Sequence, residues 1–199
     1  MNATDRSAPR RASIGARRNP ASQAAILAAA RAVLAEEGYA GFSIDAVSRR
    51  AGAGKPTIYR WWKNKAELLI EVYAAEKAMV KAAATGSLAD DLALYTVALW
   101  DFWRDTPSGR TFRALVAEAQ NDAAALAALR DKFLPERLCD VRALFAAAVA
   151  RGEIGLDEVE MRLGLYVGFN WYYVLTDQLD AGRTAIPAAM RLLAAPLPG

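Results

Sequence analysis

The chain of 199 residues contains no histidine and only one cysteine, Cys139. The lack of histidine removes the commonest general base and a common metal ligand, which argues against an enzyme and predicts no cofactor. A single cysteine cannot form an intrachain disulfide, and such sparse usage is typical of the reducing cytoplasm. Because Cys139 falls in a helical pattern, we expect a small buried or half-buried apolar residue there, with a redox sensor as the alternative.

Long apolar runs are also missing from the sequence. No segment approaches the ~20 apolar residues needed to span a bilayer. The arginines of residues 1–18 are not followed by the apolar stretch of a secretory signal. Hydrophobic residues nevertheless make up 54% of the chain, which is ample for a core. The sequence therefore predicts a folded cytoplasmic protein without a membrane partner.

Charge is distributed unevenly along the chain. Up to Ala84, 14 Lys and Arg oppose 7 Asp and Glu, a net charge of +7; from Thr85 onward 11 oppose 15, a net charge of −4. A basic front and a mildly acidic rear favour one domain that faces a polyanion. Residues 1–18 contain five arginines and one aspartate and are predicted to be a disordered basic arm. This arm either reaches DNA or is a solvated tail.

Helical periodicity and capping signals recur along the chain, whereas strand alternation of useful length does not appear. Asn19-Pro20 predicts the start of a helix and Gly38 its end. Asn64 and Glu67 have the spacing of a capping box and begin a helix that continues to about residue 83. Beyond Thr85 we predict about five helices, with breaks at Thr106-Pro107, Asn121-Asp122, Arg151–Gly155 and Asp180–Gly182. The predicted fold class is all-α.

Residues 42–69 carry the most specific pattern: two short helices joined by a tight turn at Ala51-Gly52. Ser43 is a plausible cap of the first helix, and Pro56 lies in the first turn of the second. Four apolar residues can bury this unit against the preceding helix: Ile44, Val47, Ile58 and Trp62. The outer side of the second helix then carries groups suited to base edges and phosphates in a major groove: Lys55, Thr57, Tyr59 and Arg60.

The ordered series EEGYAGFS, AVSRRAG and KPTIYRWWKNKAELL, within residues 20–73, resembles the N-terminal domain of TetR-family (TetR/AcrR-like) transcriptional repressors. The sequence departs from the commoner family pattern at Ser48, often alanine, and at Gly54, often serine. Both replacements are small, so they affect cap strength more than function. The resemblance implies an N-terminal three-helix DNA-binding domain over residues 19–66 and a larger helical ligand-binding and dimerisation domain over residues 67–199, joined by a fourth helix.

The resemblance also assigns DNA contacts to particular residues: Ser43, Lys55, Pro56, Thr57, Tyr59, Arg60, Trp61 and Lys65. The alternative for Tyr59 and Trp61 is packing within the domain. For Lys65 and Arg49 the alternative is an ordinary solvated charge. Trp62 is expected to belong to the core.

A helix from Asp157 to about Leu179 is predicted to dimerise the protein together with the last helix. Asp157 and Glu160 have capping-box spacing at its start. Two glycines four residues apart permit close helix approach, and large apolar residues flank them. The predicted interface contains Leu163, Gly164, Val167, Gly168, Trp171, Leu175, Ile186, Met190 and Leu193. Packing of the same residues within one monomer is the alternative.

The rear of the chain holds 12 of the 18 aromatic residues and is expected to enclose a ligand pocket. The candidate lining residues are Trp100, Trp103, Phe112, Phe133, Phe145, Tyr166, Phe169 and Asn170. Aromatic residues at helical spacing are more often simple core, so core packing is the alternative for each. The residue types favour an apolar or aromatic effector.

These patterns and the resemblance together predict a homodimeric repressor that binds palindromic double-stranded operator DNA. Release by a small-molecule effector is what the resemblance implies. A DNA-binding scaffold without a ligand, or an activator, is one alternative. An enzyme or carrier with an aromatic pocket is another, but no nucleophile or metal-ligand motif supports it.

Overall fold

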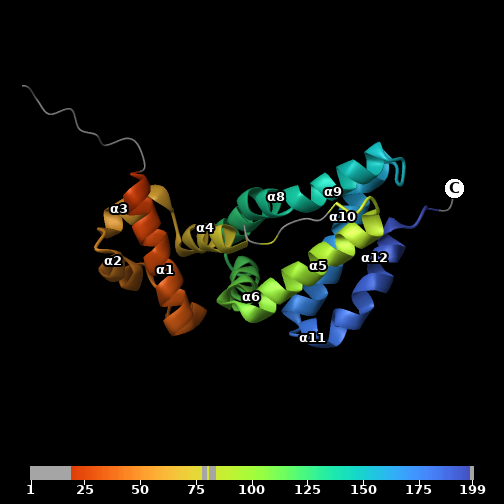
Figure 1. The fold of residues 1–199 in the computed structure, drawn as a ribbon. Helices are drawn as coiled ribbons and strands as arrows, with labels where there is room; N and C mark the ends of the chain where they lie inside the picture. The colour runs from red at the N-terminus through yellow and green to blue at the C-terminus, as the bar shows by residue number, and fades with distance from the viewer. Residues whose placement is uncertain (1–18, 78–79, 81–83, 198–199) are drawn as a thin grey trace, which may run out of the picture.

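The computed structural model describes residues 19–77, 80 and 84–197, and in these ranges it contains helices and no strands (Figure 1). The predicted all-α fold class is confirmed. The predicted basic arm, residues 1–18, lies outside the described residues. The α-helices are α1 (Pro20–Gly41), α2 (Ile44–Ala51), α3 (Lys55–Trp61), α4 (Lys65–Lys77), α5 (Leu88–Asp105), α6 (Pro107–Ala119), α7 (Ala123–Ala128), α8 (Leu134–Arg137), α9 (Cys139–Ala150), α10 (Val159–Leu175), α11 (Leu179–Gly182) and α12 (Ile186–Ala194).

Helices α1, α2 and α3 form a small bundle at one end of the molecule (Figure 1). The Asn19 side chain caps α1 by accepting a hydrogen bond from the Ala21 N–H at 3.0 Å, as predicted. Gly38 interrupts α1 with φ 65° and ψ −174°, a conformation that suits glycine, and one further turn continues to Gly41. The bundle core consists of side chains at most 2% exposed: Ile26, Val33, Val47, Ile58 and Trp62.

Helix α4 connects the small bundle to the rest of the protein. Asn64 caps it by accepting a hydrogen bond from the Glu67 N–H at 2.9 Å, which confirms the predicted start. Glu71 accepts hydrogen bonds from the Trp62 indole at 2.5 Å and from Gln23, and so fixes α4 against α1 and α3. The helix ends at Lys77; part of the predicted extension to about residue 83 lies outside the described residues.

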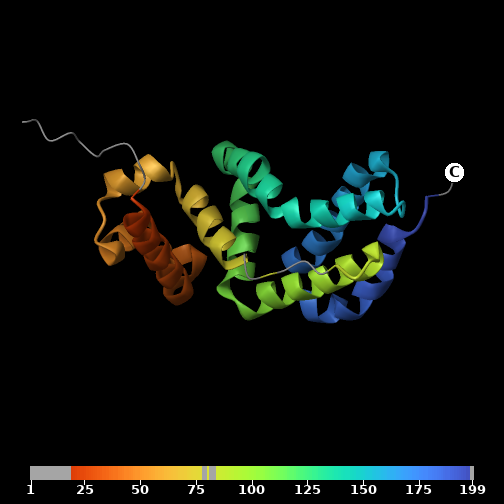
Figure 2. The same cartoon turned by 45° about the horizontal axis from the view of Figure 1, so that its top comes forward.

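The larger body is a bundle in which α5 packs against α9 and α12, and α10 packs against α9 (Figures 1 and 2). Helix α6 lies between this body and α1 and α4. The predicted breaks at Thr106-Pro107 and Asn121-Asp122 are confirmed, with Thr106 capping α6 and Asp122 capping α7. Helix α7 continues through a π-helical turn, Leu129–Phe133, into the short α8.

Three details of the rear differ from the predictions: two at the ends of helices and one at Cys139, which is not buried. The helical break lies earlier than Asp180, because α10 ends at Leu175 and Asp177 adopts a left-handed φ of 59°. At the start of α10, the predicted capping pair of Asp157 and Glu160 is not the one observed. Glu158 instead accepts a hydrogen bond from the Gly155 N–H at 3.2 Å, and Glu160 pairs with Arg142.

Cys139 is exposed, because it is the first residue of α9 and does not face the core. Among the described residues, no helix is both long and apolar enough to cross a membrane.

Buried Arg162 joins α10 to the end of α12. Its guanidinium donates hydrogen bonds to the main-chain carbonyls of Leu193 and, at 2.8 Å, of Ala195, and it pairs with Glu158, the residue just before α10. These carbonyls belong to the C-terminal end of α12, where backbone acceptors have no partner within the helix. Arg162 therefore acts as a side-chain cap that holds α12 in place.

Candidate DNA-binding surface and ligand cavity

The turn between α2 and α3 is held by both backbone and side-chain hydrogen bonds. Gly52 takes the left-handed conformation, φ 61° and ψ 26°, which glycine adopts without a Cβ penalty. The Ala53 N–H donates to the Ser48 carbonyl at 3.2 Å, and the Ser48 hydroxyl donates to the Ala53 carbonyl at 2.6 Å. Ser48, where the family more often has alanine, therefore bonds to both the N–H and the carbonyl of Ala53 and stabilises the turn.

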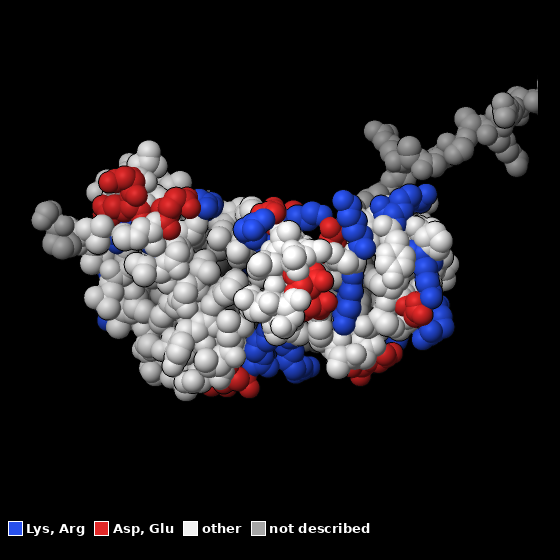
Figure 3. Space-filling model, turned by 180° about the vertical axis from the view of Figure 1, so that it is seen from behind, with Lys and Arg blue, Asp and Glu red and all other residues white. Residues whose placement is uncertain are grey.

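Helix α3 buries one face and exposes the other. Ile58 is inaccessible to solvent, whereas Lys55, Pro56, Arg60 and Tyr59, half of whose surface is open, lie on the outside. Thr57 and Trp61 are half-buried. Gly54 caps the helix without a side-chain hydrogen bond, as its residue type predicted. Lys and Arg side chains gather over this end of the molecule on the face drawn in Figure 3.

Ser43 and Lys65 lie at the starts of the two neighbouring helices. The Ser43 hydroxyl is exposed and caps α2 by accepting from the Ala46 N–H at 3.1 Å. The Lys65 ammonium donates to the Tyr39 carbonyl at 3.1 Å and lies 3.9 Å from the centre of the Tyr39 ring. Burial lowers the pKa of Lys65. It is thus an anchored cation at a helix N-terminus, a position that favours phosphate.

Two further side chains of this surface have partners within the chain. The Lys55 ammonium lies 2.6 Å from the Asp45 carboxylate, and both side chains are about half exposed. Trp61 packs edge-on against Trp62 with ring centres 5.7 Å apart. Trp62 itself is 2% exposed, which confirms that it belongs to the core.

An aromatic cavity lies where α4, α5, α6, α8 and α10 meet. The predicted pocket residues that line it are Trp103, Phe112, Phe133, Tyr166 and Asn170. The other lining residues are Tyr73, Lys77, Tyr95, Leu99, Leu134, Arg137, Leu138, Val141, Val167 and Trp171. Its free volume is about 40 Å³, room for a few water molecules and less than a drug-sized ligand requires.

Three predicted pocket residues do not line this cavity. Trp100 is buried and donates its indole N–H to Asn170 at 2.7 Å, and Phe169 stacks on its outer side with ring centres 5.7 Å apart. Phe145 is completely buried in the core. The sequence did not indicate Tyr73 and Lys77 as pocket residues, because they precede the aromatic-rich segment that follows Thr85. Both lie on one face of α4 at a spacing of four residues.

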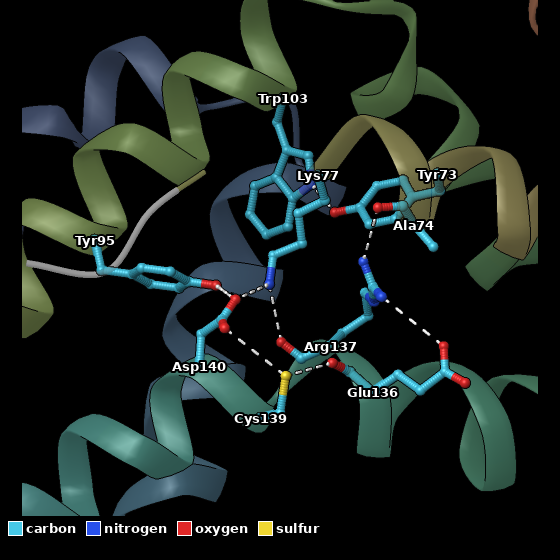
Figure 4. Close-up of polar contacts among 9 residues, drawn as sticks. All are labelled: Tyr73, Ala74, Lys77, Tyr95, Trp103, Glu136, Arg137, Cys139 and Asp140. Atoms are coloured by element: carbon cyan, nitrogen blue, oxygen red, sulfur yellow. Dashed lines mark hydrogen bonds and ion pairs between the residues drawn. The ribbon is translucent and has the colours of Figure 1, made fainter. Parts of the chain in front are cut away.

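Polar groups gather at one side of the cavity (Figure 4). The Lys77 side chain is 5% exposed; its ammonium donates to the Arg137 carbonyl at 3.0 Å and lies 3.5 Å from the Asp140 carboxylate. The Tyr95 hydroxyl donates to the same carboxylate at 3.2 Å. Burial lowers the pKa of Lys77, and Asp140 only partly opposes this effect. Nearby, the Trp103 indole donates to the Tyr73 hydroxyl at 2.6 Å.

The outer face of α10 is apolar and exposed. This apolar stripe consists of Met161, Gly164, Leu165, Gly168, Tyr172 and Leu175, which recur at helical spacing. Its four large side chains are 41–58% exposed, and α12 adds Leu192 at 77%. A Cβ placed on either glycine of the stripe would meet no atom within 4 Å.

The predicted dimer interface needs correction at four positions. Leu163, Ile186, Met190 and Leu193 are at most 8% exposed and belong to the core of the single chain, so little of their surface is left for a partner. Val167 and Trp171 are half-buried and line the cavity. Of the predicted residues, Gly164, Gly168 and Leu175 lie on the outer face.

A glycine-turned helix pair with a basic exposed second helix, joined to a separate helical body, defines a helix-turn-helix DNA-binding protein. The comparisons with known proteins agree. Residues 26–72 match the family described as bacterial regulatory proteins, tetR family, and residues 82–193 match the tetracyclin repressor-like C-terminal domain. The chain therefore belongs to the TetR family. It is a DNA-binding transcriptional regulator of the repressor type, and this family consists of transcription factors, not enzymes.

Individual relatives extend over most of the chain. The DNA-binding transcriptional repressor TetR of Mycobacteroides abscessus is 34% identical over 142 residues, which are 70% of this chain and 74% of that protein. The crystal structure of the TetR family transcription regulator SCO0332 superposes with a TM-score of 0.75 at 26% identity and covers 89% of this chain and 99% of that one. The structure of BioQ with its natural double-stranded DNA operator shares the fold, with a TM-score of 0.62 at 17% identity over 86% of this chain and 97% of that one.

Proposed function

We propose that the protein is a homodimeric cytoplasmic repressor that binds a palindromic operator and is released by a small molecule in the aromatic cavity. The observation that carries this proposal is the exposed outer face of α3. The lysine, arginine and tyrosine side chains on that face are exposed and do not pack in the core. Their N–H and O–H donors match the hydrogen-bond acceptors of base edges and phosphates. A structural relative, BioQ, is described with its double-stranded operator.

The apolar stripe of α10 supports dimerisation. Leu165 and Tyr172 are more than half exposed on the same face as Gly164 and Gly168. Contiguous apolar surface is costly in water, and a second copy related by a two-fold axis covers it with an identical stripe. The two glycines let the facing helices approach closely. A two-fold dimer then places two α3 helices on two half-sites, which accounts for a palindromic operator.

Helix α4 provides the connection between effector and operator. Tyr73 and Lys77 at its C-terminal end line the cavity, and Lys65 at its first turn lies beside the proposed DNA surface. An effector that fits only an enlarged cavity favours the conformation in which the wall, including α4, has moved. By linkage, a differential affinity of ~1–3 kcal/mol for that conformation weakens operator binding ~5- to 150-fold.

Selection of genomic fragments by the purified protein at moderate salt, followed by fluorescence anisotropy on the selected site, tests the proposal. We expect a palindromic site occupied by two chains. Tyr59→Ala and Arg60→Ala should each weaken binding at least ~10-fold, because each change removes a contact at both half-sites. Arg130→Ala is the matched control, since Arg130 is also exposed but pairs with Asp131 on the far body. Failure to select any palindrome, or equal losses in Arg60→Ala and Arg130→Ala, would refute the assignment.

A further inference from the structure

We propose that the effector is an apolar carboxylate: its hydrocarbon part fills the aromatic cavity, and its carboxyl group is bound by Lys77 and Arg137. This inference rests on the effector-controlled function proposed above and adds the chemical class of the effector. It is carried by two cations at the wall of a mainly aromatic and aliphatic space, both with unused hydrogen-bonding capacity toward the described residues.

The apolar part of the site is a set of stacked rings. Trp103 and Phe112 stack with ring centres 5.3 Å apart, and Phe112 and Phe133 stack with centres 5.7 Å apart. Tyr73 closes the group at 5.2 Å from Phe133. A ligand that contacts these surfaces needs an aromatic or aliphatic body, because polar groups placed there would lose their hydration without gaining partners.

Lys77 supplies the first cationic group. Its ammonium has three N–H donors, yet among the described residues it makes one hydrogen bond of normal length, to the Arg137 carbonyl at 3.0 Å. The Asp140 carboxylate lies farther away at 3.5 Å, also accepts from Tyr95, and is 43% exposed to water. A buried ammonium with so loose a counterion is stabilised by an additional anion.

Arg137 supplies the second cationic group. Its Nε is buried and, within the described part of the chain, has no hydrogen-bond partner. Among the same described residues, the partners of the terminal nitrogens are distant: the Ala74 carbonyl at 3.5 Å and the exposed Glu136 carboxylate at 3.8 Å. A guanidinium presents paired donors that match the two oxygens of a carboxylate. Lys77 of α4 and Arg137 of α8 both line the cavity, and Figure 4 shows the Lys77 ammonium beside the Arg137 carbonyl and Asp140, with the Arg137 guanidinium directed toward Ala74 and Glu136.

The segment that carries Arg137 is also the part of the wall that departs from regular helix. The π-helical turn Leu129–Phe133 precedes α8, and π-helical turns inside α-helical runs are frequent at functional sites. Because the free space is only about 40 Å³, a ligand must displace this wall to enter. Lys132 in the same turn pairs with Glu67 of α4 at 2.6 Å, so the displacement is passed to the helix that leads to the DNA-binding domain.

Matched acid and amide probes test the proposal with the full-length protein. The pairs are indole-3-acetate with indole-3-acetamide, 1-naphthaleneacetate with 1-naphthaleneacetamide, and 4-phenylbutyrate with 4-phenylbutyramide. Thermal shift and isothermal titration should give at least one acid that stabilises the protein and binds about 10- to 100-fold more tightly than its amide. The same acid should release operator DNA.

Variants distinguish charge recognition from general apolar binding. Lys77→Met and Arg137→Met should each reduce the preference for acid over amide about tenfold or more, whereas Arg130→Met, an exposed arginine outside the cavity, should leave it unchanged. Lys77→Arg retains the charge and should retain most of the preference; it also serves if Lys77→Met does not fold. Equal binding of acids and amides, binding of amides alone, or no stabilisation by any acid would overturn the proposal. Those results would leave operator binding intact, whereas failure of the repressor assignment would appear as loss of DNA binding itself.

Discussion

Gly168 offers the sharpest test of the dimer, through the substitution Gly168→Trp on the apolar stripe of α10. In the single chain a Cβ at this position meets no atom within 4 Å, so the indole can extend into solvent without a clash. Replacing a helical glycine also removes its backbone entropy cost, so the folding free energy of the isolated chain should become more favourable by roughly a few tenths of a kcal/mol. The variant should therefore fold at least as well as the parent.

The effect on the dimer has the opposite sign. An indole inserted between two closely packed helices overpacks the interface, at ~1–3 kcal/mol for each site. Two-fold symmetry places the substitution in the interface twice, so the dimer should lose ~2–6 kcal/mol. This corresponds to a dissociation constant that rises ~30- to 20,000-fold.

Sedimentation equilibrium over a concentration series measures this constant, and a thermal melt of the same samples reports the fold. Ala143→Trp is the matched control, because Ala143 is exposed in the middle of α9 and lies outside the apolar stripe. Operator affinity should fall in Gly168→Trp alone. A dissociation constant for Gly168→Trp that equals that of Ala143→Trp would show that α10 does not form the interface.

Three further predictions follow from single contacts. Asp45→Asn removes the carboxylate that pairs with Lys55 at 2.6 Å and should raise operator affinity ~1.5- to 5-fold in anisotropy titrations, the range of an exposed ion pair; unchanged affinity would show that Lys55 does not meet DNA. Ser48→Ala loses the hydrogen bond to the Ala53 carbonyl and should cost ~1 kcal/mol, lowering the melting temperature by ~2–4 °C in circular dichroism; no shift would contradict a stabilising role of that bond. Burial lowers the pKa of Lys77, so the unfolded chain binds this proton more tightly than the folded chain does. Burying the charged ammonium therefore costs folding free energy at low pH. This cost falls as pH rises from the lowered pKa toward 10.5, because the folded chain then loses the proton. The wild type should therefore gain stability relative to Lys77→Met as pH rises toward 10.5 in urea titrations; a constant difference would contradict the shift.

The DNA-facing half of the protein was predictable because its signals are local. Caps at Asn19, Asn64 and Ser43 and the left-handed Gly52 act over a few residues, so the sequence alone locates the helices. The same locality identifies Ile58 and Trp62 as the buried side of the unit. The bonding of Ser48 across the turn was not predictable from spacing, since it depends on the geometry that Gly52 creates.

The rear was less predictable because its arrangement depends on contacts between distant helices. Apolar residues occur on both the buried and the exposed face of α10. The sequence therefore could not distinguish buried Leu163 from exposed Leu165. The cavity is likewise lined by Lys77 of α4, which lies 60 residues before Arg137 in the chain. Only the packing of α4 against the rear brings these two cations together.

The position of α4 has a consequence for altering the protein. Lys65 and Lys77 are twelve residues apart on one helix, which spans ~18 Å at the usual rise of 1.5 Å per residue. Under the proposed function, a substitution at Tyr73 or Lys77 that changes effector binding thus acts on the same helix that leads to the DNA-binding bundle. Ligand selectivity and the level of repression in the uninduced state should therefore vary together. In a biosensor built from this chain, the level of repression without ligand would therefore have to be adjusted again for each cavity variant.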